Sequence, residues 1–254
     1  VVFYVLVARR HSSDAPGVFS YLFPRRVFLH PSALLDYKYF VVNQWLMAHL
    51  RFGGLVVGLF GLLALSQLIA AGLNAVLGAR AATEPGLVAL LAFTGINLLA
   101  WDFGKYVGHF LSHKIPLLWE FHKPHHSAEV LTPLSANRAH PIDIMLDLFF
   151  RLLCSGVVGG VFAYLYPSGI KELQILGFNA VALLIYYWIS HLQHSHIPLG
   201  YGPWLSKVLV SPHMHQVHHS QEVHHWDRNF GFVFGLWDWM FKTIYIPQRD
   251  EAFR

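Results

Sequence analysis

Long stretches of hydrophobic residues, separated by short polar segments, dominate the pattern of this chain. The longest run, residues 52–79, contains no charged residue. It exceeds the roughly 20 apolar residues that a helix needs to cross a bilayer. Three further runs qualify once they are extended into their polar ends: 86–101, 152–170 and 173–190. The pattern therefore predicts an integral, multi-pass membrane protein with about four transmembrane helices.

Turn-forming residues predict how these helices are joined. Gly and Pro occur at 78–85, and Pro167-Ser168-Gly169 forms a second break. The helices so connected would lie at about 50–77, 86–114, 142–166 and 171–194. We expect an all-α fold of two antiparallel hairpins, with residues 197–254 completing a helical cap at the membrane surface.

The remaining organisation is simple. We find no linker or low-complexity tract, so residues 1–254 are interpreted as one domain. Residues 1–50 are predicted to form an N-terminal interfacial segment, because prolines interrupt their mixed composition. The chain begins with Val rather than Met, and we expect the true N-terminus to lie upstream.

Composition supports the membrane assignment. Hydrophobic residues make up 55% of the chain and charged residues only 13%, against a usual charged share of about 25%. Mean hydropathy is +0.43. The single cysteine, Cys154, excludes an internal disulfide. The net charge of +4 comes without an interleaved aromatic and basic stripe, which argues against nucleic-acid binding.

Basic residues predict the orientation. The two hairpin turns contain only Arg80 and Lys171, whereas the N-terminal, 105–138 and C-terminal regions hold nearly all the rest. By the positive-inside rule, these three regions face the cytoplasm. Every histidine cluster falls within or beside them, so the clusters are expected on the cytoplasmic face.

The histidines form the main chemical signal. A His-x-x-His-His pattern occurs at 122–126 and again at 215–219. Positions i, i+3 and i+4 share a helix face, and adjacent residues diverge by about 100°. Neighbouring histidines could thus serve two metals, and imidazole is the commonest protein metal ligand. The predicted ligands are His109, His113, His122, His125, His126, His191, His194, His215, His218 and His219.

Other interpretations of single residues stay open. Solvated or hydrogen-bonded histidines are the simpler explanation for any one pair. Asp102 shares a helix face with His109 and His113, and is a candidate to orient a ligand imidazole. Further candidates for such outer groups are Glu120, Asn137, His140, His196, Asp227 and Asp238. No catalytic residue beyond the metal ligands is predicted.

Several motifs taken together resemble the fatty acid hydroxylase superfamily, also called the sterol desaturase family. They are LWEFHKPHHS after His109-x3-His113, NRAHP at 137–141, SPHMHQVHHS at 211–220, DRNFG at 227–231 and WDWMFKT at 237–243. The resemblance covers roughly residues 90–246, and we take 86–246 as the catalytic region. It departs at His191-x2-His194-Ser-His196, where the family often has another spacing, and we favour His191 and His194 as ligands. Lys242 stands where glycine is usual.

The resemblance implies four transmembrane helices beneath a cytosolic cap that holds two Fe ions and activates O2. Imidazoles alone suit Fe, Zn, Cu or Ni, so the choice of iron comes from the resemblance. Zinc could occupy the site in a purified sample. The implied activity is that of an O2-dependent di-iron hydroxylase or desaturase acting on a lipid, sterol or other hydrophobic substrate. A related form of this oxygenase activity would cleave ether lipids through an unstable hydroxylated product.

Two other functions are compatible with parts of this pattern. A non-enzymatic membrane subunit could use its histidines to hold haem or pigment, but such axial histidines usually lie singly inside spanning helices. A zinc hydrolase would need His-Glu-x-x-His, which the chain lacks.

The expected partners are the lipid bilayer, the hydrophobic substrate, O2 and a separate electron donor. The sequence contains no dinucleotide fingerprint and no Cys set for an iron–sulfur cluster. Electrons would therefore come from a cytochrome b5-like or ferredoxin-like protein. Basic residues that flank the histidines could attract it: Lys114, Lys123, Lys207 and Arg228.

Overall fold

A computed structural model describes residues 17–168, 188–248 and 251, and all their side chains except those of residues 46–57 and 59. Within these residues the regular structure is helical, apart from one isolated antiparallel bridge between Leu209 and Phe234. Three apolar helices are long enough to cross a membrane, over Phe60–Leu77, Leu87–Lys114 and Pro141–Leu165. The predicted all-α membrane class is thus confirmed. The predicted fourth span falls mostly outside the described residues.

The first long helix, α3, begins much earlier than the sequence pattern predicted. It runs over Pro31–Leu77, which is 47 residues, or about 70 Å at about 1.5 Å per residue. Its start is set by Pro31 in the first turn and by His30, whose ring nitrogen accepts a hydrogen bond from Ser32 N at 3.2 Å. Two short helices, α1 (Val18–Leu22) and α2 (Arg25–Phe28), precede it.

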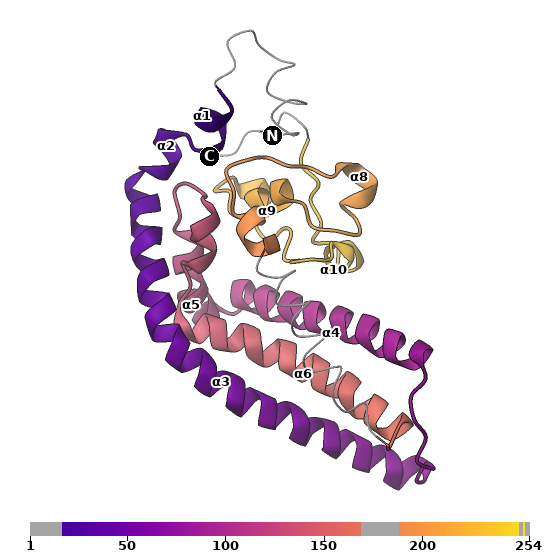
Figure 1. Cartoon of the computed structure of the whole chain (residues 1–254). Helices are drawn as coiled ribbons and strands as arrows, with labels where there is room; N and C mark the ends of the chain where they lie inside the picture. The colour runs from indigo at the N-terminus through magenta and orange to yellow at the C-terminus, as the bar shows by residue number, and fades with distance from the viewer. Residues whose placement is uncertain (1–16, 169–187, 249–250, 252–254) are drawn as a thin grey trace.

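Helix α6 (Pro141–Leu165) lies between α3 and α4 (Leu87–Lys114), as Figure 1 shows. Glycines permit this close packing. A Cβ atom on Gly104 of α4 would lie 2.4 Å from the Phe150 carbonyl oxygen, and one on Gly160 would lie 2.9 Å from that of Ser66. Small residues are the usual means by which membrane helices approach each other. Although α3 and α4 are consecutive in the chain, α6 is therefore the central helix.

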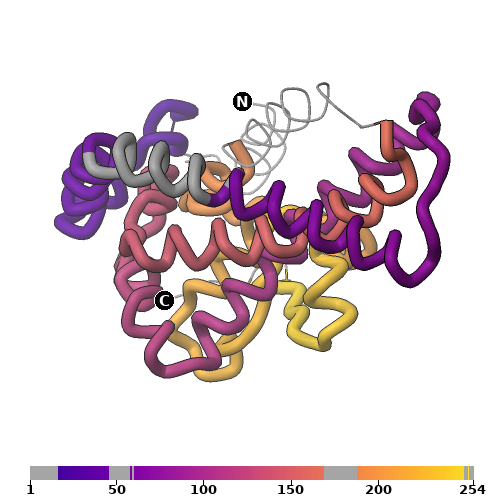
Figure 2. The backbone as a smooth tube through the Cα atoms, turned by 90° about the horizontal axis from the view of Figure 1, so that it is seen from below, coloured from indigo at the N-terminus to yellow at the C-terminus, as the bar shows by residue number. Residues whose placement is uncertain are grey.

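The remaining elements form a cap on one side of the long helices. They are α5 (Pro116–His126), η2 (Pro133–Asn137), α8 (Gly202–Leu205), α9 (Pro212–His218), η4 (Val223–His225) and α10 (Leu236–Met240). Seen from below, the long helices lie in front of this cap (Figure 2). Met214, Val217 and Phe230 are fully buried and form its core. The cap lies beside the C-terminal part of α4, where His109 and His113 are placed.

Candidate metal centre

Nine of the ten predicted ligands gather in two groups. The first group contains His109, His113, His122, His126 and His218, and the second contains His125, His194, His215 and His219. Within each group the possible ligand atoms all lie within 4.8 Å of one another. The groups are neighbours, since the ring centroids of His126 and His219 are 4.5 Å apart.

Each group draws on three parts of the chain. Helix α4 supplies two rings of the first group. Helix α5 supplies rings to both groups, and so does α9 together with its C-cap residue His219. His125 and His126 belong to different groups, as do His218 and His219. This is the divergence expected of adjacent residues on a helix. The short helix α9 is begun by Ser211, whose hydroxyl accepts from Met214 N at 3.2 Å.

Three rings of the first group are fixed by hydrogen bonds from their Nδ1 atoms to oxygen acceptors. His109 donates to the Phe230 carbonyl oxygen at 2.9 Å, and His218 donates to that of Arg228 at 2.7 Å. His122 donates to the Asp143 carboxylate, with both oxygens at 3.1 Å. A carbonyl or carboxylate oxygen only accepts, so Nδ1 must carry the proton. Nε2 of each ring is then left with a lone pair.

Two rings of the second group are fixed in the same way. His125 Nδ1 donates to the Arg138 carbonyl oxygen at 3.3 Å, and His194 Nδ1 donates to that of Ser190 at 2.7 Å. Their Nε2 atoms lie 3.2 Å apart. With both protons on Nδ1, these two nitrogens direct lone pairs at each other, which is repulsive unless a cation lies between them.

The other nitrogen separations are similar. Nε2 of His126 lies 3.1 Å from that of His113 and 3.2 Å from that of His122. His215 Nε2 lies 3.0 Å from that of His194 and 3.2 Å from that of His219. Ligands at about 2.0–2.1 Å from one metal would be about 2.8–3.4 Å apart. Nε2 of His109 and of His218 are buried with no hydrogen-bond partner among the described residues. The residues therefore fit a metal in each group.

Burial keeps these imidazoles neutral. Desolvation lowers the pKa of His218 to about 3 and that of His194 to about 4. The pKa values of His125, His126, His215 and His219 lie well below the usual range for the same first cause, with repulsion from neighbouring histidines added. Metal ligation requires the neutral ring, so the folded cap holds these side chains in the competent form.

Four predicted residues lie elsewhere. His191 falls outside both groups, although it is close enough to lower the pKa of His194. His196 Nε2 donates to the Tyr21 carbonyl oxygen at 3.0 Å. His140 caps α6 by accepting from the backbone N–H of residue 142, and the amide of Asn137 donates within its own turn to residue 134. No interaction among the described residues joins His196, His140 or Asn137 to a ring of the two groups, and their outer role stays a prediction.

Asp102 and Asp238 both accept hydrogen bonds from the cap segment that carries Phe230. Asp238 accepts from Phe230 N at 2.8 Å, and burial raises its pKa to about 6. The Phe230 carbonyl oxygen in turn accepts the hydrogen bond from His109 Nδ1. Asp102 accepts from Val233 N at 3.1 Å and from the indole of Trp237 at 3.0 Å. None of these bonds involves a ring of the two groups, and a role for Asp102 in orienting a ring stays a prediction.

The other two acidic candidates lie at the surface. Asp227 pairs with Lys114 at 2.5 Å, and Glu120 pairs with Lys123. Neither contacts a histidine of the two groups in any described interaction. Each acid instead forms an ion pair with a lysine that was predicted to attract the electron donor.

Sequence reasoning missed Asp143. Its signal was present, because His140-Pro141 marks the start of a helix and Asp143 follows in the first turn. The Arg138 carbonyl was also missed, and a main-chain acceptor leaves no trace in the residue types.

A third set of possible ligands lies apart from the two groups and consists of His224, His225 and Glu251. Glu251 Oε1 accepts from His225 Nε2 at 3.0 Å and from the Tyr245 hydroxyl at 2.7 Å. These bonds fasten residue 251 to the cap.

Comparison with known proteins gives the class. The family described as Fatty acid hydroxylase matches residues 94–243, and the chain belongs to that family. It is similar to the ornithine lipid hydroxylase OlsE of Rhizobium tropici, at 27% identity over 62% of this chain and 43% of that protein. The human alkylglycerol monooxygenase is 30% identical over 60% of this chain and 29% of its own length.

The mouse cholesterol 25-hydroxylase is 30% identical over 66% of this chain and 52% of its own length. The chain thus spans about half or less of the curated relatives that it matches. No solved structure matches it significantly. The resemblance of the motifs to this family is confirmed, and the relatives are lipid- and sterol-modifying oxygenases.

Proposed function

We propose that this chain is a membrane-bound non-haem di-iron oxygenase that hydroxylates or desaturates a lipid, sterol or other hydrophobic substrate. One observation carries the proposal: bare Nε2 atoms of neutral imidazoles converge in two adjacent groups. The family membership supports iron over the other metals that imidazole binds. The names of the relatives support a lipid-like substrate.

The reaction follows from the oxidation balance. In hydroxylation, a C–H bond and O2, with two electrons and two protons from outside, give an alcohol and water. In desaturation, two C–H bonds and the same supply give an alkene and two waters. Bound iron would supply the O2 activation that side chains cannot provide. The chain's own residues hold the ligand rings in place and keep them neutral.

The position of the site suits a substrate dissolved in the bilayer. Helix α4 has 28 residues, or about 42 Å, against a hydrocarbon core of about 30 Å. Its C-terminal turns, with His109 and His113, therefore extend past the core while the helix still spans it. The distribution of Lys and Arg favours the cytoplasmic side for this end.

The proposed electron donor is a separate protein of cytochrome b5-like or ferredoxin-like character. Lys114 and Lys123 are already paired with Asp227 and Glu120. Arg228 is the strongest remaining candidate for docking, because its own carbonyl holds His218 of the first group.

The proposal is tested by expressing the chain and analysing extracted lipids by mass spectrometry. Products heavier by 16 Da or lighter by 2 Da are expected, and they should vanish in a His126→Ala/His219→Ala variant. Unchanged lipids, with the chain in the membrane and a reductase system present, would contradict it. A strong Soret or chlorophyll band in the purified protein would instead support the haem or pigment alternative.

A further inference from the structure

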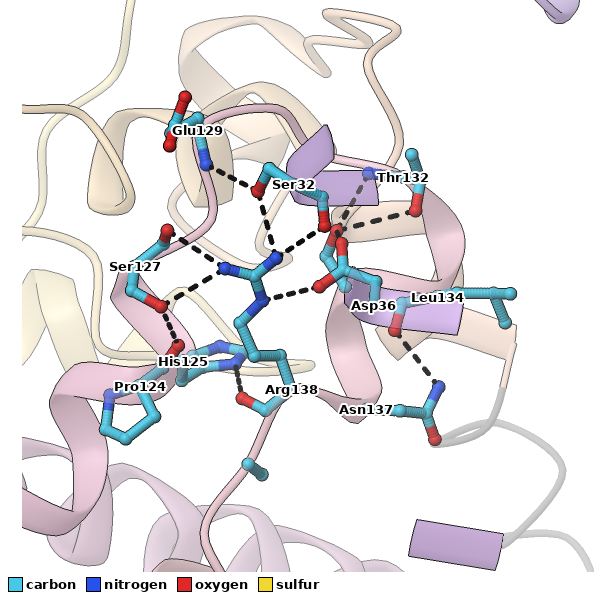
Figure 3. A network of polar contacts seen from close by, with 12 residues as sticks. Ser32, Asp36, Pro124, His125, Ser127, Glu129, Thr132, Leu134, Asn137 and Arg138 are labelled. Atoms are coloured by element: carbon cyan, nitrogen blue, oxygen red, sulfur yellow. Dashed lines mark hydrogen bonds and ion pairs between the residues drawn. The ribbon is translucent and has the colours of Figure 1, made fainter. Parts of the chain in front are cut away.

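A buried ion pair joins the start of α3 to the loop after α5. Asp36 is 0% exposed and Arg138 is 2% exposed, and Arg138 Nε donates to Asp36 Oδ1 at 2.5 Å. Taking two charges out of water is costly unless all their polar atoms are satisfied. Figure 3 shows the guanidinium at the centre of such a network.

Every guanidinium N–H has an acceptor. Nη1 donates to the Ser127 carbonyl oxygen at 2.9 Å and to its hydroxyl at 3.2 Å. Nη2 donates to the Ser32 carbonyl oxygen at 2.7 Å and to its hydroxyl at 2.9 Å. Ser127 is the C-cap of α5, the helix that carries three of the clustered histidines. Arg138 therefore fastens the end of α5 to α3.

Helix α3 also fixes the turn that ends at Arg138. The second carboxylate oxygen of Asp36 accepts from the Ser135 hydroxyl at 2.6 Å, and Ser135 closes the capping box of η2 with Thr132. Two helical turns further along α3, Asn43 Nδ2 donates to the Asn137 carbonyl oxygen at 2.6 Å and to that of Ala139 at 3.4 Å. The main chain at Arg138 is thus held on both sides.

That main chain reaches the metal centre. The Arg138 carbonyl oxygen accepts from His125 Nδ1 at 3.3 Å, and His125 Nε2 lies 3.2 Å from His194 Nε2 in the second group (Figure 3 shows the first contact). We infer that the Asp36–Arg138 ion pair positions His125 and so sets the metal affinity of the second group. Asp36 lies outside residues 94–243, so a segment beyond the family match would complete the site. This inference rests on the proposed function.

The test uses the full chain in nanodiscs, stripped with a chelator and titrated with Co²⁺ alone. Binding is followed by visible absorption, and metal is counted by mass spectrometry. Wild type should bind two ions. In Asp36→Asn, one ion should bind about 10- to 100-fold more weakly, as expected when an outer-shell partner is lost. The weakened spectral component should be the one lost in His194→Ala and retained in His113→Ala.

A second, half-buried charge cluster provides the control. Asp147 accepts from Arg151 Nε at 2.9 Å and lies 3.2 Å from Lys105 Nζ, between α6 and α4. Neither hydrogen bonds to a clustered ring in any described contact. The charge of Lys105 acts on rings of both groups, so Asp147→Asn should change the two affinities alike and should not weaken the second group selectively. Equal weakening of the same site in this variant would trace the effect to packing and overturn the inference.

The remaining outcomes are decisive. Two sites of wild-type affinity in Asp36→Asn, or equal weakening of both sites, would overturn the inference. If Asp36→Asn does not reach the membrane, Arg138→Lys decides by the same criteria, because lysine keeps the charge but lacks the five-donor fork. Fewer than two ions in wild type would defeat the proposed function itself, whereas two ions bound with wild-type affinity in Asp36→Asn would defeat only this inference.

Discussion

The two histidine groups differ in what holds their rings. In the first group, a carboxylate and two cap carbonyls fix three of five rings by Nδ1. In the second group, two carbonyls fix two of four rings. Nδ1 of His215 and of His219 is buried without a hydrogen-bond partner among the described residues.

This difference has a chemical consequence. A carboxylate on Nδ1 fixes the ring and raises the basicity of Nε2. The first group is therefore expected to hold its metal more tightly, through Asp143 of α6. The second group depends on main-chain positions that α3 and the cap establish. Four changes test this contrast, from the largest expected effect to the smallest. They are removal of a ring, loss of the acceptor that holds a ring, protonation of the rings and weaker docking of the electron donor.

Removing one ring of the first group should have the largest effect. His122→Ala or His218→Ala is expected to abolish turnover while the protein stays in the membrane, because the long helices carry insertion. Activity and membrane fractionation are measured together, with the exposed His224→Ala as control. Near-normal turnover in either variant would remove that ring from the ligand set.

Removing only the carboxylate that holds a ring should have a milder effect than removing the ring. Asp143→Asn keeps an amide oxygen near His122 Nδ1 but loses the negative charge, so metal affinity of the first group should fall about 10- to 100-fold. Co²⁺ titration measures this, and Asp227→Asn at the surface should leave both sites unchanged. A weakened second group with an intact first would reverse the comparison.

Lowering the pH should reduce the stability of the metal-free protein. Burial lowers the pKa of His194 to about 4 and that of His218 to about 3, whereas unfolded imidazole titrates near about 6.5. The unfolded chain then binds more protons between about pH 6.5 and 4, so stability falls as pH falls through that window. The thermal midpoint of chelator-treated protein should drop from pH 7 to pH 5. A midpoint that does not change would contradict the buried, neutral state of these rings.

The smallest effect concerns docking beside the first group. Arg228→Ala should lower the donor-dependent rate a few-fold and flatten its salt dependence, since rim charges act mainly on association. Metal content should not change, because only the main chain of Arg228 holds His218. Arg26→Ala, in an exposed turn of α2, is the control. Equal salt dependence in wild type and Arg228→Ala would exclude this docking site.

The sequence predicted what depends on local spacing. The spacing of His122, His125 and His126 predicted which neighbours would diverge, and the structure places them in two groups. The start of α3 was missed, because the prolines and mixed composition of residues 1–50 suggested an interfacial segment, whereas that segment places Asp36 and Asn43 on α3. Both are buried against the loop after α5.

Long-range contacts explain the other differences. Asp102 was a candidate for orienting a ring because of its helix face, and the structure adds an unforeseen partner, the cap loop that folds back on α4 and donates to both its oxygens. Asp143 reaches His122 only because α6 packs beside α5. Spacing along one helix does not encode such pairings, and main-chain acceptors such as Arg138 have no residue signature.

The most direct test of the two-metal account is the anomalous scattering of iron-loaded protein crystals at the iron edge. Two adjacent peaks are predicted, one within each histidine group, with ring nitrogens at about 2.0–2.2 Å. The first should be surrounded by five rings and the second by four. No peak, or a single peak, in iron-replete protein would contradict the account.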